Sequence, residues 1–136
     1  MRINTAAEST GIKVFGPRGY DETDRLISGA KLLVSTAEFE GISNTFLQAW
    51  RRGIPVVSFV DPDEIIAKND LGIVVKSFED LVTAVERLRK GISDDDSRKI
   101  KEFFDRTFTT EIIARRFDEL VRDIFQETQI KRIGDE

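Results

Sequence analysis

Residues 31–60 read KLLVSTAEFEGISNTFLQAWRRGIPVVSFV, and their pattern indicates the fold class. It holds two short apolar runs, 31–35 and 56–60, on either side of a segment rich in helix formers, 44–53. Short apolar runs bounded by turn residues are typical of buried strands. A strand, a helix and a second strand in succession predict a right-handed crossover between two parallel strands.

The same alternation continues on both sides of this stretch. Residues 12–15 and 72–75 read as two further strands, and residues 21–30 and 62–69 as helices between strands. Gly53 and Pro55 stand where a helix ends and a strand begins. We therefore expect the α/β class, with a parallel sheet of about four strands flanked by helices.

The C-terminal part is helical throughout. Residues 77–90 begin with a capping pair, Ser77 and Asp80. This helix should pack on the sheet through an apolar stripe formed by Phe78, Leu81, Val82, Val85 and Leu88. Ser93 opens a second helix, and the acidic residues of its first turn, 94–96, interact favourably with the helix dipole. A calcium site is the less favoured interpretation of these residues, because the glycine and the distal Glu of a calcium-binding loop are missing. A third amphipathic helix starts at Thr109 or Thr110, and its apolar stripe is Ile113, Phe117, Leu120, Val121, Ile124 and Phe125.

The composition limits the number of domains and the kinds of chemistry that the chain can perform. The 136 residues are 40% hydrophobic and 34% charged, which fits one globular domain over 12–136, with its C-terminal helices at 93–128, after a flexible tail at 1–11. A net charge of −4 argues against nucleic-acid binding as the main role. The chain has no His and no Cys, which excludes an imidazole base, thiolate chemistry and zinc sites built on these residues.

The cellular location is predicted from the first residues and from the lengths of the apolar runs. The first residues do not resemble a leader peptide, and no run approaches the roughly 20 apolar residues of a membrane span. We expect a cytoplasmic protein whose membrane association, if there is any, is peripheral.

Residues 35–50 are the segment that carries chemical information. They run from the end of a strand through a small, glycine-bearing loop into a helix, and ligands of open α/β sheets bind at such strand ends. Gly41, Ser43, Asn44 and Thr45 could present backbone N–H groups to a phosphate at the start of the helix. Ser43 or Asn44 could equally be a simple N-cap, and the residues alone leave both interpretations open.

A resemblance to a known family rests on the same segment. Residues 40–49, EGISNTFLQA, followed by 53–57, GIPVV, resemble the signature of the group 1 retaining glycosyltransferases of the GT-B fold. The similarity extends over roughly residues 12–90. It implies a Rossmann-like half-domain that binds a nucleotide diphosphate sugar, facing an acceptor-binding half-domain.

The resemblance also implies roles for individual residues. Glu40 matches the first Glu of the family's motif and is the expected catalytic residue, beside the donor sugar or phosphate. Gln48 matches the second Glu, which contacts the ribose; an amide there loses one acceptor oxygen. The residues expected to offer backbone amides to the diphosphate are Gly41, Ile42, Ser43, Asn44 and Thr45.

Two departures from the family affect the expected activity. The strands and loops that carry the family's cationic side chains, and the acceptor-binding half-domain, are not recognisable in this sequence, so the chain alone should not transfer a hexose to a glycan or another acceptor. The expected partners are the nucleotide-sugar donor and the missing half-domain or a partner chain. No cofactor and no metal are expected.

Two alternatives remain open at this stage. A non-catalytic α/β module for binding or assembly, derived from the same family, is favoured by Gln48, the missing cations and the amphipathic C-terminal helices. A receiver-like fold receives less support, because its acidic cluster after the first strand and its facing lysine are not found in the sequence.

Overall fold

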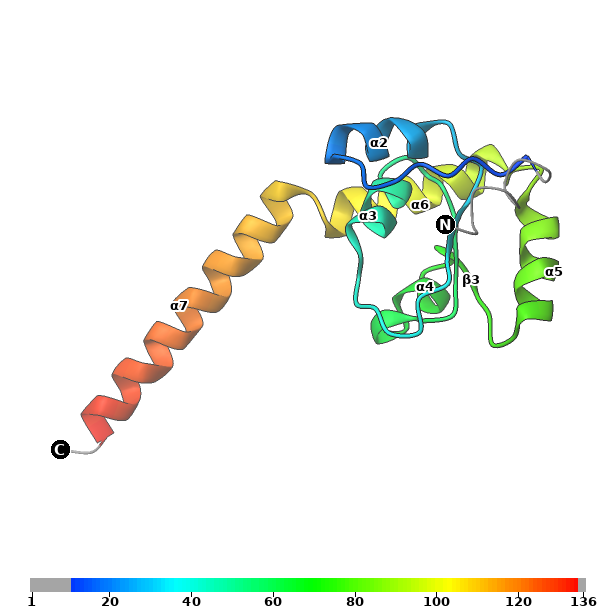
Figure 1. Cartoon of the computed structure of the whole chain (residues 1–136). Helices are drawn as coiled ribbons and strands as arrows, with labels where there is room; N and C mark the ends of the chain where they lie inside the picture. The colour runs from blue at the N-terminus through cyan, green and yellow to red at the C-terminus, as the bar shows by residue number, and fades with distance from the viewer. Residues whose placement is uncertain (1–10, 135–136) are drawn as a thin grey trace.

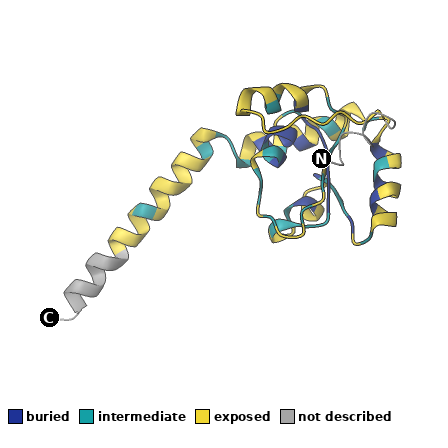
Figure 2. Cartoon of the chain, viewed as in Figure 1, coloured by how far each residue is buried: buried dark blue, intermediate teal, exposed yellow. Residues whose placement is uncertain are grey.

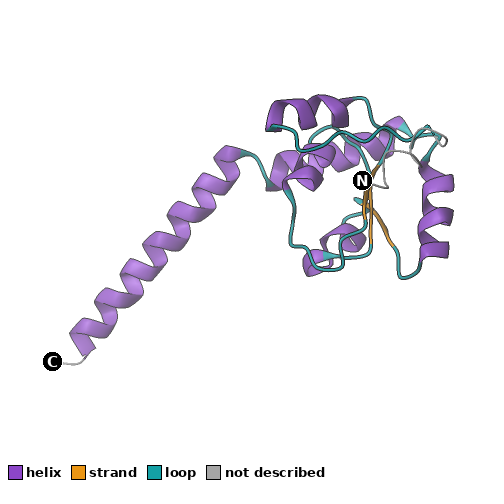
Figure 3. Ribbon diagram, in the orientation of Figure 1, coloured by secondary structure: helices purple, strands orange, loops and turns teal. Residues whose placement is uncertain are grey.

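The computed structural model describes residues 11–134, with the side chains of the last helix described through Gln126. The expected tail, 1–11, lies outside the described residues except for Gly11. Figure 3 shows helices around a short sheet, with one long helix extending away from them. The elements in chain order are α2 (Tyr20–Ser28), β1 (Leu33–Ser35), α3 (Asn44–Trp50), β2 (Val56–Ser58), η1 (Pro62–Glu64), α4 (Ile65–Lys68), β3 (Gly72–Val74), α5 (Phe78–Leu88), α6 (Asp94–Thr107) and α7 (Thr110–Gly134).

The sheet is parallel and has three strands in the order β1-β2-β3. The α/β class is therefore confirmed, while the fourth expected strand, 12–15, does not form. A strand is held by the N–H and C=O groups of a neighbour, and β1 pairs on one side only, with β2. Ile12, Val14 and Phe15 are instead exposed, outside the sheet.

Helices cover both faces of the sheet, so the body has three layers. Val56 of β2 packs in one apolar cluster with residues of α2, α3, α4 and α6, and Val57, on the opposite face, packs with α5. Every residue of β2 is buried, as expected for a central parallel strand covered on both sides. Figure 2 shows this arrangement, with buried positions gathered between the helices and the strands. The predicted packing of 77–90 on the sheet is confirmed.

Trp50 is the centre of the larger apolar cluster. Its side chain is fully buried, and its indole N–H donates to the backbone carbonyl of Leu71 at 3.3 Å. The rings of Phe46 and Phe108 lie 5.7 and 6.1 Å from its ring. A buried indole needs such an acceptor because an unpaired N–H in the core is costly. Trp50 thus joins α3, the segment before β3 and the end of α6.

Two glycines permit close approaches between elements. Gly53 follows α3 with φ +70°, and a Cβ there would overlap Ser97 of α6, whose hydroxyl donates to the Gly53 carbonyl at 2.9 Å. A Cβ on Gly72 would overlap the carbonyl of Val56 on the neighbouring strand. Only glycine allows the backbones to pack this closely at both sites.

The single helix predicted over 62–69 is divided in two. Asp63 and Glu64 have φ values of +54° and +58°, so the chain turns left-handed between η1 and α4. The Asp61 carboxylate lies across this turn and accepts from the backbone N–H groups of Ile66 at 2.8 Å and Ala67 at 3.1 Å. Asp61 therefore caps α4, beyond the left-handed turn.

The predicted caps of the later helices are confirmed. Ser77 and Asp80 form a capping box at the start of α5, and the Ser93 hydroxyl accepts from the Asp96 N–H at 3.1 Å at the start of α6. The acidic first turn of α6 pairs with basic residues one turn later, since Asp95 contacts Arg98 and Lys99. These contacts fit the helix-start interpretation of 94–96.

The last helix, α7, extends away from the body and touches it near α6 (Figure 1). Its apolar stripe, predicted from spacing, is largely exposed. Within residues 11–134, no helix is both long enough and apolar enough to cross a membrane.

Candidate functional site

The carboxyl ends of the three strands lie level with one another. Ser35 of β1 is in register with Ser58 of β2, which is in register with Val74 of β3. A loop and then a helix follow each strand, so three helices begin at this edge. Because ligands of open α/β sheets bind outside the carboxyl ends of the strands, this edge is the candidate site.

Glu40 is anchored at this edge by the last residue of β1. The Ser35 hydroxyl donates to Oε2 of Glu40 at 3.0 Å and accepts from the backbone N–H of Ala37 at 3.4 Å. Both Ser35 and Glu40 are half-buried, whereas Glu38 is exposed. Within the described chain, no basic side chain forms an ion pair with Glu40. The result is a carboxylate with one positioned oxygen and no ion-pair partner among residues 11–126.

The turn that follows Glu40 leads directly into α3. Ser43 is the N-cap, because its hydroxyl accepts from the Phe46 N–H at 3.3 Å; the capping interpretation is thus confirmed for Ser43 rather than Asn44. The Ser43 and Thr45 hydroxyls are 2.9 Å apart. Ile42 packs against the core cluster, which fixes the turn, while Gly41 and Asn44 are exposed. The interpretation as an anion site stays a prediction.

Gln48 lies one turn further along α3 and is buried, with 4% of its surface exposed. The structure therefore groups Ser35, Glu40, Ser43 and Thr45 at the carboxyl edge, whereas Gln48 lies on the side of α3 that packs against the body. The expected contact of Gln48 with a ribose stays a prediction. Its burial could not be read from the sequence, since it depends on what packs over α3.

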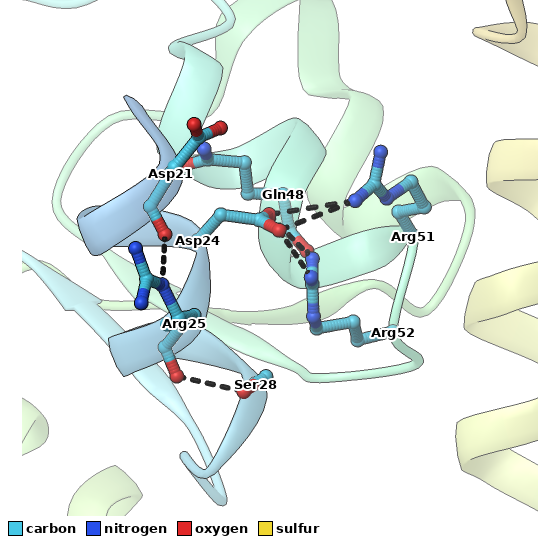
Figure 4. Close-up of polar contacts among 7 residues, drawn as sticks. All are labelled: Asp21, Asp24, Arg25, Ser28, Gln48, Arg51 and Arg52. Atoms are coloured by element: carbon cyan, nitrogen blue, oxygen red, sulfur yellow. Dashed lines mark hydrogen bonds and ion pairs between the residues drawn. The ribbon is translucent and has the colours of Figure 1, made fainter. Parts of the chain in front are cut away.

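The surroundings of Gln48 include an ion-pair cluster that joins α2 to the end of α3 (Figure 4). Asp24 of α2 accepts two hydrogen bonds from Arg52, at 2.7 and 2.5 Å, and lies 3.4 Å from Nη2 of Arg51. Arg52 also donates to the backbone carbonyl of Gln48 at 3.2 Å. The hydrogen bond from Arg52, supported by the charges of both arginines, lowers the pKa of the Asp24 carboxyl from its ordinary value of 3.8.

This cluster changes the interpretation of Arg51 and Arg52. From the sequence they read as helix-dipole partners on a solvated surface, but Arg52 is largely covered, with 22% of its side chain exposed. Both guanidinium groups are held by Asp24, which lies 28 residues before Arg52. No local pattern in the sequence could have identified this partner.

Two aromatic rings near the strand ends are exposed. Phe39, next to Glu40, has 93% of its surface exposed, and Phe78, at the start of α5, has 69%. Phe78 and Val82 were expected to pack as part of the apolar stripe of this helix; they are exposed, and Leu81 and Leu88 carry the packing. The helical spacing specifies which side chains share a face, but it does not specify which of them the body covers.

The opposite, amino edge of the sheet also has a hollow, of about 560 Å³. Its lining includes Lys31, Arg51 and Lys101. Arg51 is paired with Asp24, and Lys101 with Asp105 at 2.7 Å, so most of this positive charge is already neutralised. The described residues hold no group of three or more acidic side chains placed for a metal ion. The carboxyl edge remains the stronger candidate.

Comparison with known proteins identifies one family. The model of the family described as "Glycosyl transferases group 1" matches residues 2–90, which is more than half of the chain and runs through α5. No curated protein and no solved structure matches the chain. The matched range contains the carboxyl-edge site, while α6 and α7 lie beyond it.

Proposed function

Because the chain belongs to the group 1 glycosyltransferases, we propose that it is the part of such an enzyme that binds the nucleotide diphosphate sugar donor. The observation that carries this proposal is the positioned carboxylate of Glu40 at the carboxyl edge of a parallel sheet. In this proposal the complete enzyme would transfer a hexose from the donor to a glycan or to another acceptor with a hydroxyl group.

Glu40 is the proposed catalytic residue. An ionised carboxylate accepts hydrogen bonds from sugar hydroxyls, and such contacts orient a donor against its leaving group. The bond from Ser35 fixes Oε2, which limits the rotation of the carboxylate before a ligand arrives. Ser35 is therefore a positioning residue in this proposal.

The turn from Gly41 to Thr45 is the proposed diphosphate contact. Backbone N–H groups at the start of a helix carry a partial positive charge and can donate to phosphate oxygens. The Ser43 and Thr45 hydroxyls are hydrogen-bonded to one another at 2.9 Å, which leaves one hydroxyl hydrogen as a further donor. The packing of Ile42 in the core supports a preformed turn, which lowers the entropy cost of binding.

Gln48 is the proposed ribose contact, and its burial makes this the most demanding part of the proposal. A ribose contact requires that the Gln48 amide be reached through the small exposed part of its surface. Gln48→Ala separates the two roles. A ribose contact predicts weaker nucleotide binding with unchanged phosphate binding, whereas a purely structural role predicts a lower unfolding temperature with unchanged affinity.

The chain is proposed to be inactive alone. The departing diphosphate develops negative charge, which cations in an enclosed site must stabilise, and Glu40 has no cationic neighbour among the residues described. Closure over the donor also requires a second surface that excludes water. An acceptor-binding half-domain or a partner chain would supply both.

The test is titration of labelled protein with UDP, GDP, ADP and their sugar conjugates, followed by NMR chemical shifts, with inorganic phosphate as a reference. We expect shifts confined to residues 40–48 and a preference for one base. Glu40→Gln should weaken binding of the sugar conjugate about tenfold, because the neutral amide is a poorer acceptor. Glu38→Gln is the matched control, since Glu38 is an exposed carboxylate two residues away and should leave affinity unchanged.

Two outcomes would contradict the proposal. Shifts at the amino-edge hollow instead of residues 40–48 would move the binding site to the opposite edge of the sheet. Absence of any shift at millimolar nucleotide would favour the second candidate, a non-catalytic binding or assembly module of the same family. The exposed stripe of α7 is the observation that favours this second candidate.

A further inference from the structure

The apolar stripe of α7 is exposed although the helix is long and amphipathic. Ile113, Phe117, Leu120 and Phe125 have between 46% and 67% of their surface exposed. Figure 2 shows exposed positions along most of the described part of this helix. Removing large apolar side chains from water is favourable, so a continuous stripe of this kind is typical of a surface that docks on another one.

The spacing of the stripe fits a helical partner. Ile113, Phe117, Leu120 and Ile124 follow one another at intervals of four, three and four residues, which is the seam of a coiled coil. Val121 and Phe125 widen the stripe on one side. Side chains at this spacing insert between those of a second helix that carries the same pattern.

The charged residues beside the stripe identify which helix that is. With about 3.6 residues per turn, Arg116 and Asp123 lie on one flank of the stripe, and Ala114 and Val121 on the other. One flank thus carries one positive and one negative side chain, and the other flank is apolar. Asp118 and Arg122 lie further round the helix and pair with one another at 2.8 Å.

The charged flank has a centre that can be compared with that of the seam. Arg116 and Asp123 are equally distant from the midpoint between Glu119 and Leu120. A two-fold axis at this point places Arg116 of one helix opposite Asp123 of an antiparallel copy. The apolar positions are centred within one residue of the same axis, so apolar side chains also meet apolar ones.

We propose that the α7 stripe is the docking surface for α7 of a second copy of this chain, in antiparallel orientation. A parallel pair is disfavoured because identical positions then lie level, so Arg116 does not meet Asp123 of the other helix. This surface lies outside the matched range, 2–90, and is separate from the carboxyl edge of the sheet. A contact between two helices is small for an interface, so we expect a reversible dimer.

Sedimentation velocity of the full chain over a roughly hundredfold range of concentration tests the proposal. The wild-type chain should shift from monomer to dimer as concentration rises. Arg116→Asp places like charges across the axis twice and should weaken association roughly tenfold. Asp123→Arg should weaken it similarly, and the double variant should recover wild-type association.

Arg115→Asp is the matched control, because Arg115 lies on the side of α7 opposite the stripe and the same charge change there should leave association unchanged. Circular dichroism of each variant checks that the helix is retained. A chain that stays monomeric at every concentration overturns the proposal. Association that is insensitive to Arg116→Asp, or that the double variant does not restore, overturns the antiparallel register.

A distance measurement checks the orientation independently. The chain has no cysteine, so a single spin label can be attached at Glu111→Cys without other changes. In the antiparallel pair the two labels are separated by about 25 Å along the helix axis. In a parallel pair they lie within about 10 Å of one another before the label tethers are added. The shorter distance would overturn the proposal.

Discussion

At the scale of single residues, the interactions that matter most join side chains far apart in the sequence. Asp24 is held by Arg52 through two hydrogen bonds, and Arg51 adds its charge to the same carboxylate. These contacts pin α2 to the end of α3, next to the backbone of Gln48. Glu40 is held in a comparable way, although by a neutral hydroxyl. The body thus positions both carboxylates, and within the part of the chain that the structure describes only Asp24 of the two forms ion pairs.

The Asp24 cluster predicts a pH dependence of stability. The pKa of the Asp24 carboxyl is lower in the folded chain than in the unfolded chain, so the unfolded chain binds a proton more readily. The stabilisation by the ionised carboxylate is therefore complete above the ordinary pKa of 3.8, and it is lost as the pH falls through the lower pKa of the folded chain. In thermal melts, Asp24→Asn should be less stable than wild type above about pH 5, and the difference should shrink as pH falls below the ordinary value.

Asp21→Asn is the control for this measurement. Asp21 lies on the same helix, and its side chain forms no ion pair in the described structure. Its melting temperature should follow that of the wild type over the whole pH range. A constant difference between Asp24→Asn and wild type at all pH values would show that the Asp24 charge does not stabilise the fold.

At the scale of elements, the turn between η1 and α4 carries unfavourable backbone geometry. Asp63 and Glu64 are consecutive residues with positive φ, where a side chain crowds the backbone and glycine does not. The turn is held from outside by the Asp61 carboxylate, which accepts from two N–H groups of α4. It follows β2 directly and so lies at the same edge as Glu40. Strained turns of this kind are often found beside functional sites.

Glycine at position 64 should stabilise the chain. Glu64→Gly relieves the left-handed conformation but removes the exposed ion pair with Lys68, 2.6 Å apart. Glu64→Ala removes the same ion pair and keeps the strain, so it is the matched reference. We expect the glycine variant to have a free energy of unfolding about 1 kcal/mol higher than the alanine variant in urea melts. Equal stability of the two variants would mean that this turn is not strained.

At the scale of the whole molecule, the body and α7 are separate units of stability. Both apolar clusters draw their described residues from the chain before α7, ending with Phe108, which stacks on Trp50. The long helix extends away from these clusters (Figure 1). The body therefore carries the fold and the candidate site, and α7 carries the proposed docking surface.

A chain that ends at Thr109 should therefore keep its fold. We expect its free energy of unfolding to change by less than about 1 kcal/mol, or roughly 4 °C in melting temperature, at protein concentrations where association is weak. The truncated chain should remain monomeric at high concentration. A loss of cooperative melting would show instead that α7 contributes to the core. The comparison requires circular dichroism melts and sedimentation of both chains.

Much of this protein follows from the sequence alone, because it depends on neighbours within a few residues. The alternation of apolar runs and helix formers determined the α/β class, and the caps at Ser43, Ser77 and Ser93 followed from side chains three residues from their partners. The motif at residues 40–49 identified the family that the comparison then confirmed. Glu40 was placed at the end of a strand by the same pattern.

The features that depend on contacts between distant residues could be seen only in the folded chain. Residues 12–15 have the composition of a strand but do not join the sheet, although β1 pairs only with β2. Gln48 lies on a predicted helix, yet its burial depends on what packs over that helix, and the partner of Arg52 lies 28 residues away. The stripe of α7 was predictable, but its exposure was not, because spacing specifies which side chains share a face and only packing specifies whether that face is covered.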